Sequence, residues 1–376
     1  MNPVRHSVAD DHGGVARYVE QLVAAQVAAR GRRVEVFGPV ALRLPTAVER
    51  FPYRPIHRPL ALDHWKFALL AAGQASRIAG GMLHHAHGLT LTGADVYTVH
   101  GFYTREWLAG TGRRSTFSRP MRILSRLHFE LMRRLERRGL STARHVVFVS
   151  TENLRYAENV LGFARPSAVH IVFPGVDTDR YSPSLREAKT HERWMRFPEI
   201  SSQARWLLFV GHDYTRKGLL RLLPALGEVA RTLGCSGTYE ILVFGRDPFH
   251  LRTAQALARS SGVSARFFTD ESRLLAAFAL SDVLLMDSVS EGFPLVLLEA
   301  MASGCVPVVS PCGGVSDCIR DGVNGIVRAS AAEIAQVALT VADDALASMS
   351  AHARRDACDW HWASVARAYE RIYAAV

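Results

Sequence analysis

Short apolar runs that alternate with helix-like segments constrain the fold of this chain more than any other feature. In the second half these runs are WLLFVG at 206–211, ILVFG at 241–245, ARFFT at 265–269, DVLLM at 282–286 and VPVVS at 306–310. Each run is followed by a segment whose apolar residues recur at helical spacing. Strands that alternate with helices in this way form parallel sheets built from βαβ units. The pattern predicts an α/β fold with a doubly wound sheet.

The first half of the chain repeats this pattern. The segment GGVARYVEQLVAAQVAARGRRVEVFGP predicts a helix that a glycine pair opens and Gly31 ends, followed by a strand at 34–37. Further strands are expected at 94–99 and 145–149. The preceding segment NPVRHSVADDH is more polar than an ordinary first strand, which departs from the pattern. A second doubly wound unit is nevertheless expected here.

The length and the linker signals predict how the chain is divided. At 376 residues the chain is too long for one ordinary core. The segment at 172–183, VFPGVDTDRYSP, is rich in Pro, Gly and Asp, which is typical of a linker. We therefore predict a first domain at 1–172, a second at 173–357 and an amphipathic C-terminal helix at 358–376. One side of that helix carries Trp362, Val365, Ala368 and Tyr369.

Composition narrows the class of protein. Apolar residues make up 48% of the chain, which is typical of a soluble globular protein, and no uninterrupted apolar run of about 18 residues predicts a membrane-spanning helix. The N-terminus lacks an apolar h-region, so we expect no secretory signal peptide. The five cysteines lack metal-site spacing, and their odd number indicates reduced thiols in a cytoplasmic protein.

The stretch SEGFPLVLLEAMASG at 290–304 places Glu291 and Glu299 at the two ends of an apolar run. Pro294 favours the start of a helix, so Glu291 should precede the helix and Glu299 should lie about a turn and a half inside it. Backbone N–H groups and the helix dipole make such a helix start an anion site, which the two carboxylates would flank. The alternative is one capping glutamate and one solvated glutamate.

This segment resembles the E-x7-E motif of the family 4 glycosyltransferases. Other segments resemble motifs of the same family in the same order: GGVARYV, DVYTVHG, FPGVDTDRYSP, FVGHDYTRKGL, ILVFGRDP and GVSDCIRDGVNGIV. The resemblance covers nearly the whole chain, and members that add glucose to the inner core of lipopolysaccharide are the most similar. It implies the GT-B fold: two Rossmann-like domains that face each other across a cleft, with a C-terminal helix that crosses back to the first domain.

The resemblance also implies roles for charged residues. Arg216 and Lys217, which follow Gly211 in the loop after a strand, would neutralise the leaving diphosphate. Glu291 would hold hydroxyls of the sugar, and Glu299 would bind the ribose hydroxyls. A solvated Arg-Lys pair in a surface loop is the alternative.

Further contacts follow from the same resemblance. His100, at the end of a strand, would touch the donor sugar near the reacting carbon, although a packed and hydrogen-bonded histidine is the alternative. Gly13 and Gly14 would let phosphate or sugar approach a helix start. The backbone around the first glutamate of the motif would contact sugar and diphosphate: Gly292, Phe293, Pro294 and Leu295.

The implied reaction is transfer of a hexose from a nucleotide diphosphate-sugar, with UDP-glucose favoured, to a saccharide or lipid-linked glycan acceptor, with retention of configuration. The Arg216–Lys217 pair would serve in place of a divalent cation, so we expect no metal and no other cofactor. The histidines of LHHAH, His84, His85 and His87, invite a metal interpretation. Alternation puts His85 and His87 on one side of a strand, but the sequence indicates no third ligand.

Positive charge is concentrated in one segment. Between Arg113 and Arg144 there are ten arginines and two glutamates, which gives +8 of the net charge of +10. The segment predicts a helix at 118–138, started by Ser118 and Pro120. One stripe of this helix carries Leu124, Leu127, Leu131 and Leu135, and another face carries Arg122, Arg126, Arg133 and Arg137, with Phe129 among them.

This distribution favours a local anionic surface over a nucleic acid, because arginines interleaved with an aromatic suit an anionic membrane interface. In the resembling lipopolysaccharide enzymes the corresponding region is thought to contact the membrane, which implies peripheral association with the inner face of the cytoplasmic membrane. A helix that faces the core with its leucines and water with its arginines is the alternative.

Other functions stay open on the sequence alone. A nucleotide-sugar epimerase of the same fold would share the nucleotide contacts and need no acceptor. A noncatalytic nucleotide-binding module would need no reacting groups. A nucleic-acid binder would use the arginines at 113–144 along a phosphate backbone, with steep salt dependence, but no nucleic-acid motif accompanies them.

Overall fold

The computed structural model describes residues 2–8, 13–29, 32–53, 81–88, 93–108, 119–164, 168–270 and 272–376, without the side chains of 107, 108 and 119–125. The chain divides into two compact units. Unit 1 comprises Met1–Gly175 and Trp362–Val376, and unit 2 comprises Val176–His361. The chain therefore passes from one unit to the other at 175/176 and 361/362, where the sequence predicted 172/173 and 357/358.

Unit 1 contains a parallel sheet with the strand order β3-β2-β1-β4-β5-β6-β7. Its strands are β1 (Val4–Val8), β2 (Val34–Pro39), β3 (Glu49–Tyr53), β4 (Leu83–His87), β5 (Val96–Val99), β6 (His145–Phe148) and β7 (Ala168–Ile171). Its helices are α1 (Gly13–Ala28), α3 (Tyr103–Leu108), α4 (Arg119–Thr142), α5 (Thr151–Asn159) and α14 (Trp362–Ala374). The expected strands at 34–37, 94–99 and 145–149 are present, and the strand expected to carry His85 and His87 is β4. Strands β3 and β7 had no sequence prediction.

The polar strand β1 lies in the middle of this sheet and is completely buried. Its polar side chains all have partners: Arg5 pairs with Glu35, and Ser7 Oγ lies 2.9 Å from His84 Nε2. His6 bonds to Gln26 and His87. A polar group is tolerated in a core when it is hydrogen-bonded, which explains how so polar a segment becomes a central strand.

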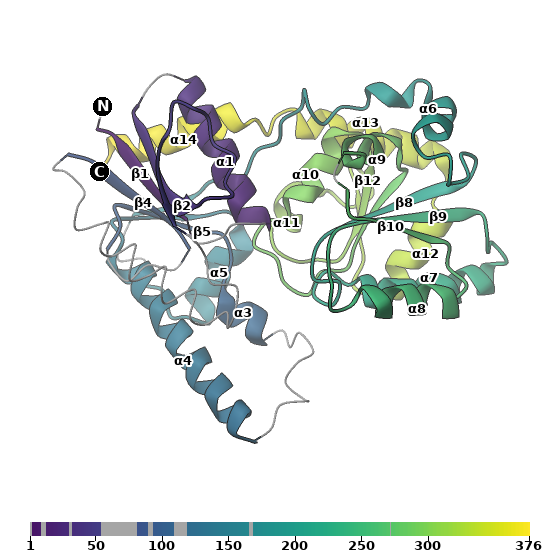
Figure 1. Ribbon diagram of the computed structural model, residues 1–376, viewed down its shortest axis with the longest axis horizontal. Coiled ribbons are helices and arrows are strands. Elements are labelled where there is room, and N and C mark those ends of the chain that lie inside the picture. The colour runs from purple at the N-terminus through teal and green to yellow at the C-terminus, as the bar shows by residue number, and fades with distance from the viewer. Residues whose placement is uncertain are drawn as a thin grey trace. The chain divides into compact units, whose positions relative to one another are not determined.

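Helix α14, at the C-terminus of the chain, packs on α1 (Figure 1). Its buried face carries Trp362, Val365, Ala366, Tyr369, Ile372 and Tyr373. Ala368, expected on this face, is only half-buried, and Ala366 is buried instead. Tyr18 of α1 meets α14 directly, since its hydroxyl lies 3.0 Å from that of Tyr369. The expected return of the last helix to the first unit is confirmed.

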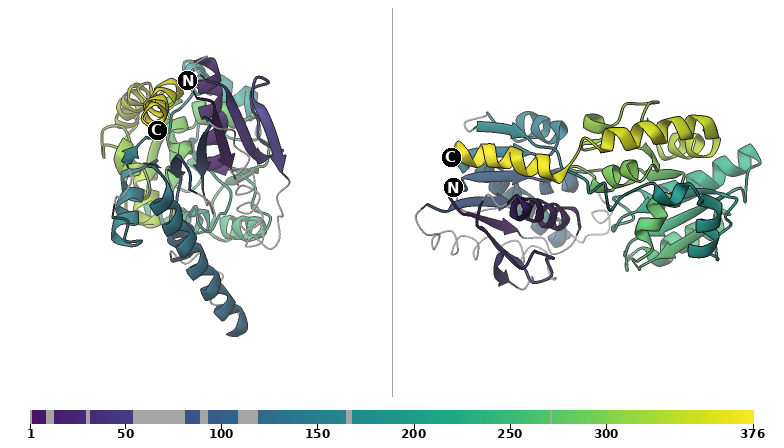
Figure 2. Two further views of the ribbon diagram at one scale, coloured as in Figure 1. Left: turned by 90° about the vertical axis from the view of Figure 1, so that its left-hand side faces the viewer. Right: turned by 90° about the horizontal axis from the view of Figure 1, so that it is seen from above.

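Helix α4 contains the expected basic helix and extends away from the sheet of its unit (Figures 1 and 2). Met132 and Leu135 are buried, whereas Leu127 is 65% exposed. The alternative interpretation, in which the leucines of this helix face the core, therefore does not hold at Leu127. Ser118 and the side chains of Pro120, Arg122 and Leu124 lie outside the described residues, as does Gly31 after α1.

Unit 2 contains a second parallel sheet, with the order β10-β9-β8-β11-β12-β13. Its strands are β8 (Arg205–Val210), β9 (Tyr239–Phe244), β10 (Ala265–Phe268), β11 (Val283–Met286), β12 (Val306–Val309) and β13 (Ile326–Val327). The five runs that predicted strands all form them. Helices cover both faces of the sheet (Figure 1): η1 (Ser184–Arg186), α6 (Lys189–Arg196), α7 (Leu219–Leu233), α8 (Leu251–Ser260), α9 (Leu274–Leu280), α10 (Leu295–Ala302), α11 (Val315–Cys318), α12 (Ala331–Thr340) and α13 (Asp343–Ala357).

Both sheets are parallel, and helices connect their strands, so the predicted α/β class is confirmed. Parallel strands end at a common edge, so the loops that follow β8, β9 and β11 in unit 2 lie near one another. Among the described residues, no helix combines the length and the apolarity that a membrane span requires.

Candidate functional site

The loop between β8 and α7 places two cations at the carboxyl edge of the unit 2 sheet. Gly211 continues the ladder, since its N–H donates to Phe244 O at 2.9 Å. The loop then folds on Asp213, whose Oδ1 accepts from the N–H of Arg216 at 3.1 Å and whose carbonyl accepts from the N–H of Lys217 at 2.9 Å. Asp213 has a φ of 56°, a left-handed conformation that aspartate tolerates better than most residues. The loop presents Arg216 and Lys217 side by side.

Asp247, which follows β9, anchors this loop to the neighbouring strand. Its Oδ2 accepts from the N–H of Tyr214 at 2.8 Å and lies 2.9 Å from Nδ1 of His250. Burial alone would raise the pKa of Asp247, but the hydrogen bonds from Tyr214 and His250 outweigh it and lower the pKa below its usual value. The Asp247 carboxylate therefore stays charged and holds the loop in place.

The loop after β11 lies directly against the loop after β8. The N–H of Val289 donates to Arg216 O at 2.9 Å. Gly218 has a φ of 88°, and a Cβ at this position would overlap the carbonyl oxygen of Asp287. Only glycine allows both the backbone conformation and this close approach. Arg221 completes the contact, because its Nε lies 2.6 Å from Oδ2 of Asp287.

Glu291 lies where these two loops meet. Its Oε1 pairs with Nζ of Lys217 and lies 3.5 Å from Nη1 of Arg216. The same Nη1 donates to Ser290 O at 3.0 Å. Glu291 is only 8% exposed, so its charge needs compensation within the protein. The structure thus brings together three of the four residues predicted to be catalytic.

The protonation state of Glu291 follows from this geometry. Burial alone would raise the pKa of its carboxyl group, but Lys217 and Arg216 outweigh burial and hold the pKa below its usual value. Arg216 also pairs with Asp213, since its Nε lies 3.5 Å from Oδ2 of that residue. The cluster therefore combines two cations with the buried carboxylate of Glu291 and the more exposed carboxylate of Asp213, at the edge of a parallel sheet. The two cations can bind an anion while the carboxylate of Glu291 accepts hydrogen bonds from hydroxyl groups.

Helix α10 begins after Pro294, as the sequence predicted, with Pro294 as an extended N-cap residue. Glu299 lies in the second turn of this helix and is buried. Phe293 packs closely against Gly314, where a Cβ would overlap the phenyl ring. The loop from Glu291 to Leu295 is therefore fixed at both ends, by the cations on one side and by this packing on the other.

Sequence reasoning missed the residues that hold this cluster in place: Asp247, Asp287, Gly218 and Gly314. A signal for the two aspartates was available, since Asp247 and Asp287 follow β9 and β11 at the edge where ligands bind in parallel sheets. The requirement for glycine at Gly218 and Gly314 follows only from the position of the neighbouring loop in the folded structure.

In unit 1, the glycine pair opens α1 as predicted. Gly13 has a φ of 84°, and a Cβ on Gly13 or Gly14 would meet no described atom within 4 Å. Close packing against described residues therefore does not explain why both positions are glycine. His100 directly follows β5 and is partly buried. Its Nε2 lies 3.0 Å from Nδ1 of His87, so His100 is a hydrogen-bonded histidine.

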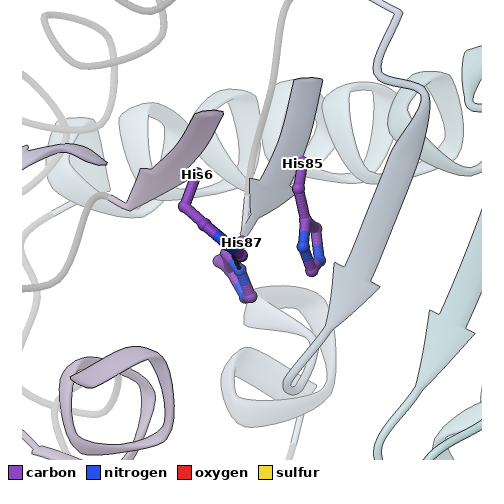
Figure 3. Close-up of side chains that lie close together, drawn as sticks. All are labelled: His6, His85 and His87. Atoms are coloured by element: carbon purple, nitrogen blue, oxygen red, sulfur yellow. Dashed lines mark hydrogen bonds between the residues drawn. The ribbon is translucent and has the colours of Figure 1, made fainter. Parts of the chain in front are cut away.

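Three histidines gather on one side of the unit 1 sheet (Figure 3). Two of them, His85 and His87 of β4, were expected on one side of a strand. The third is His6 of β1, which the sequence did not indicate as a partner. One ring nitrogen from each lies within 4.8 Å of the others, a spacing that could hold a metal ion. Every ring nitrogen of the three already has a side-chain partner, however. A cation bound by these nitrogens would have to displace hydrogen bonds that they already form.

Comparison with known protein families gives two matches along the chain. The family described as "Glycosyltransferase Family 4" matches residues 12–180. The family described as "Glycosyl transferases group 1" matches residues 204–344. The two matches thus fall one in each half of the chain, and the second includes every residue of the Arg216–Lys217–Glu291 cluster.

Two relatives at the sequence level are D-inositol 3-phosphate glycosyltransferases. That of Corynebacterium aurimucosum is 30% identical over 227 residues, which are 56% of this chain and 52% of the relative. That of Xylanimonas cellulosilytica is 29% identical over 218 residues, 55% of this chain and 51% of the relative. The chain therefore spans about half the length of the relatives it matches.

Solved structures of similar fold include glycosyltransferases. WaaG, involved in lipopolysaccharide biosynthesis, has a TM-score of 0.78 at 22% identity. The match covers 97% of this chain and 98% of the WaaG chain. Sucrose-phosphate synthase from Thermosynechococcus elongatus has a TM-score of 0.78 at 18% identity, with full coverage of both chains. HepE from Anabaena, in complex with UDP and glucose, has a TM-score of 0.73 at 15% identity, also with full coverage. The expected GT-B fold is confirmed.

Proposed function

Because this chain belongs to the family 4 glycosyltransferases, we propose that it transfers a hexose from a nucleotide diphosphate-sugar to a saccharide or lipid-linked glycan acceptor. The observation that carries this proposal is the cluster of Arg216, Lys217 and Glu291 at the carboxyl edge of the unit 2 sheet. UDP-glucose is the favoured donor. The structure of HepE with UDP and glucose, a protein of similar fold, supports this choice.

The cluster suits a leaving diphosphate because its charges are already in position. Arg216 and Lys217 both contact Glu291, and Arg216 also contacts Asp213, so a diphosphate that enters would replace Glu291 as a partner of both cations. Glu291 would then be available to accept hydrogen bonds from sugar hydroxyls. Preorganised charges of this kind stabilise a transition state without further reorganisation.

We propose that the reaction needs no divalent cation and no other cofactor. The two cations supply the positive charge that the diphosphate requires as the glycosidic bond breaks. Retention of configuration would follow from attack on the same face of the sugar, with the departing phosphate accepting the proton of the acceptor hydroxyl. His100, Gly13, Gly14 and Glu299 keep the donor-binding roles that the resemblance implies.

An assay with a panel of candidate acceptors tests the reaction. We expect UDP release from UDP-glucose to require an acceptor and to persist after treatment with a chelator. NMR of the product should show the anomeric configuration of the donor. Conversion of the donor to its epimer without an acceptor would contradict the proposal in favour of an epimerase. Activity restored only by Mg²⁺ or Mn²⁺ would contradict the metal-free mechanism.

A further inference from the structure

A continuous chain of hydrogen bonds in unit 1 connects the buried interior with His100. Oε1 of Gln26 lies 2.9 Å from Nε2 of His6. Nδ1 of His6 lies 3.0 Å from Nε2 of His87, and Nδ1 of His87 lies 3.0 Å from Nε2 of His100. Gln26, His6 and His87 are each at most 2% exposed, and Figure 3 shows His6 and His87 meeting across adjacent strands.

The three imidazoles of this chain are neutral at physiological pH. Burial lowers the pKa of His6 to about 4 and that of His100 to about 3. The pKa of His87 also lies well below its usual value, because of burial and then because of His85 and the other nearby histidines. A neutral imidazole has one donor and one acceptor nitrogen, so each link fixes the direction of the next.

The amide of Gln26 sets the direction of the whole chain. Its Oε1 can only accept, so His6 carries its proton on Nε2 and accepts at Nδ1. His87 must then donate from Nε2 and accept at Nδ1. His100 in turn donates from Nε2, which leaves the lone pair on its Nδ1.

Tyr373 contacts the other end of the Gln26 amide. Nε2 of Gln26 donates to the Tyr373 hydroxyl at 3.2 Å, and that hydroxyl lies 2.7 Å from Nδ1 of His85. Nε2 of His85 lies 2.7 Å from Oγ1 of Thr98. When His85 carries its proton on Nε2, its Nδ1 accepts from the Tyr373 hydroxyl, whose oxygen then accepts from Gln26. An amide turned by 180° would reverse every proton position from Gln26 to His100.

We propose that Gln26, His6 and His87 are positioning residues that fix His100 as its Nε2–H tautomer, so that Nδ1 accepts a hydrogen bond from a hydroxyl of the bound sugar. No hydrogen bond between described residues uses this Nδ1, and His100 is partly exposed. A lone pair there suits a sugar hydroxyl, which can donate, and not a fully ionised diphosphate, which cannot. The sugar contact rests on the proposed function, whereas the tautomer does not.

NMR of the full chain with ¹⁵N-labelled histidine tests the tautomer directly. Long-range proton–nitrogen correlations distinguish protonated from unprotonated ring nitrogens. We expect His6, His87 and His100 all to carry the proton on Nε2, unchanged between pH 8 and pH 6. A proton on Nδ1 of His100 would overturn the proposal. So would stoichiometric binding of Zn²⁺ that shifts the signals of His6, His85 and His87 together, because these residues would then form a metal site.

Two variants test whether the distant residues set the tautomer. Gln26→Met keeps the size of the side chain and removes both hydrogen bonds, and Tyr373→Phe keeps the ring and removes the hydroxyl that orients the amide. In each variant the two ring nitrogens of His100 should shift towards averaged values, as both tautomers become populated. His84→Gln is the matched control. His84 is buried in β4, the strand of His87, but it bonds to Ser7 and not to the chain that leads to His100. This variant should therefore leave the tautomer of His100 unchanged. An unchanged His100 in Gln26→Met and in Tyr373→Phe would overturn the proposal.

Calorimetry with UDP and UDP-glucose separates this inference from the proposed function. Gln26→Met should weaken UDP-glucose about fivefold relative to UDP, the factor expected for one hydrogen bond. Affinity for UDP itself should not change. An unchanged ratio in a variant whose tautomer has changed would overturn the sugar contact. Failure of the wild-type protein to bind either compound would reject the proposed function instead, while the NMR experiment would still decide the tautomer.

Discussion

At the scale of single residues, the pair of Lys217 and Glu291 has two separable effects, one on stability and one on turnover. Glu291 is buried, and its carboxylate is compensated by Lys217 and by Arg216 at 3.5 Å. Its pKa is lowered, so this pairing stabilises the fold above the pKa of the unfolded chain, about 4.5. The stabilisation is lost as the pH falls through the lower pKa of the folded state.

We therefore expect Lys217→Met to lose stability as well as activity. A buried charge that loses a partner costs about 1–3 kcal/mol, and Arg216 keeps the cost in this range. Turnover should fall about 10²–10³-fold, as for the loss of one charge that stabilises a transition state. Urea unfolding and turnover at saturating donor measure the two effects.

The double variant Lys217→Met/Glu291→Gln separates these effects. Removal of the second charge should restore most of the lost stability, because no uncompensated charge stays buried. Turnover should not recover, since neither group is present to act on the donor. Arg259→Ala, at an exposed position on α8, serves as the control and should change neither quantity. Recovery of turnover together with stability would show that Lys217 acts only on the fold.

Glu299 gives a second prediction at this scale. If it binds the ribose hydroxyls, Glu299→Ala should weaken UDP and UDP-glucose equally, by roughly tenfold, because hydrogen bonds to a charged group are worth about 1.5–3 kcal/mol. Calorimetry on folded variants tests this, with Glu228→Ala, at an exposed position on α7, as the control. Unchanged affinity for UDP would remove the assignment.

At the scale of secondary-structure elements, the sequence predicted the strands of unit 2 well and those of unit 1 only in part. The apolar runs that become β8 and β11 can be recognised as strands from their own residues, without knowledge of the strands beside them. By contrast, β1 and β4 carry Arg5, His6, Ser7 and three histidines, which an apolar pattern does not recognise as buried. Their partners, such as Gln26 and Tyr373, lie up to 288 positions away in the sequence.

The candidate site shows the same limit. Arg216, Lys217 and Glu291 could be predicted because each lies in a motif that follows an apolar strand. The position of Asp247 after a strand indicates the edge of the sheet, but its partner could not be predicted, because that partner is the backbone of Tyr214 in another loop. The partner of Gly218, the backbone of Asp287, also belongs to another loop. A motif predicts which residues gather at the edge of the sheet, whereas the contacts that hold the motif in place require the fold.

The junction of α3 and α4 predicts a pH effect that a conventional surface glutamate would not give. Glu136 of α4 is buried and accepts from Oγ1 of Thr104 at 2.6 Å and from its N–H at 3.3 Å. Burial raises the pKa of Glu136 to about 7, despite these hydrogen bonds. The folded state therefore binds a proton that the unfolded state has released, so stability falls as the pH rises from about 4.5 through 7.

Replacing Glu136 by Gln should remove this effect. Relative to the wild-type protein, Glu136→Gln should gain roughly 3 kcal/mol of unfolding free energy between pH 5 and pH 8. The comparison between variant and wild type cancels the contribution of the buried histidines, which destabilise the fold as the pH falls. Denaturant titrations at the two pH values measure the difference. Parallel pH profiles would show that Glu136 titrates normally.

Helix α4 carries the prediction of membrane association. Arg126 and Arg137 are exposed together with Leu127, whereas Arg133 already pairs with Glu130. Basic residues near an anionic bilayer contribute about 1 kcal/mol each, and salt screens this attraction. We expect cosedimentation with vesicles that contain anionic lipid, little with neutral vesicles, and release at high salt.

The vesicle experiment has a control of equal charge. One variant replaces the four predicted arginines of the helix by Gln: Arg122, Arg126, Arg133 and Arg137. The other replaces four exposed arginines of unit 2: Arg231, Arg252, Arg259 and Arg266. The first should abolish binding and the second should retain it. Equal losses would indicate a response to net charge alone, and no binding by the wild-type protein would favour a soluble acceptor.

At the scale of the whole molecule, each unit is a parallel sheet with its own core. The unit 2 core is formed by apolar strands and helices, and the charged cluster lies in the loops at the edge of its sheet. In unit 1 a polar network reaches into the middle of the sheet and ends at His100. The central claim is that the unit 2 cluster binds the diphosphate of a nucleotide-sugar.

Isothermal titration of UDP and UDP-glucose into the wild-type protein, Lys217→Met and Glu291→Gln tests this claim most directly. The wild-type protein should bind both compounds, and Lys217→Met should weaken both by a similar factor, since both contain the diphosphate. Glu291→Gln should keep its affinity for UDP and lose the additional affinity for UDP-glucose. Equal affinities in all three proteins, or no binding to the wild-type protein, would contradict the claim.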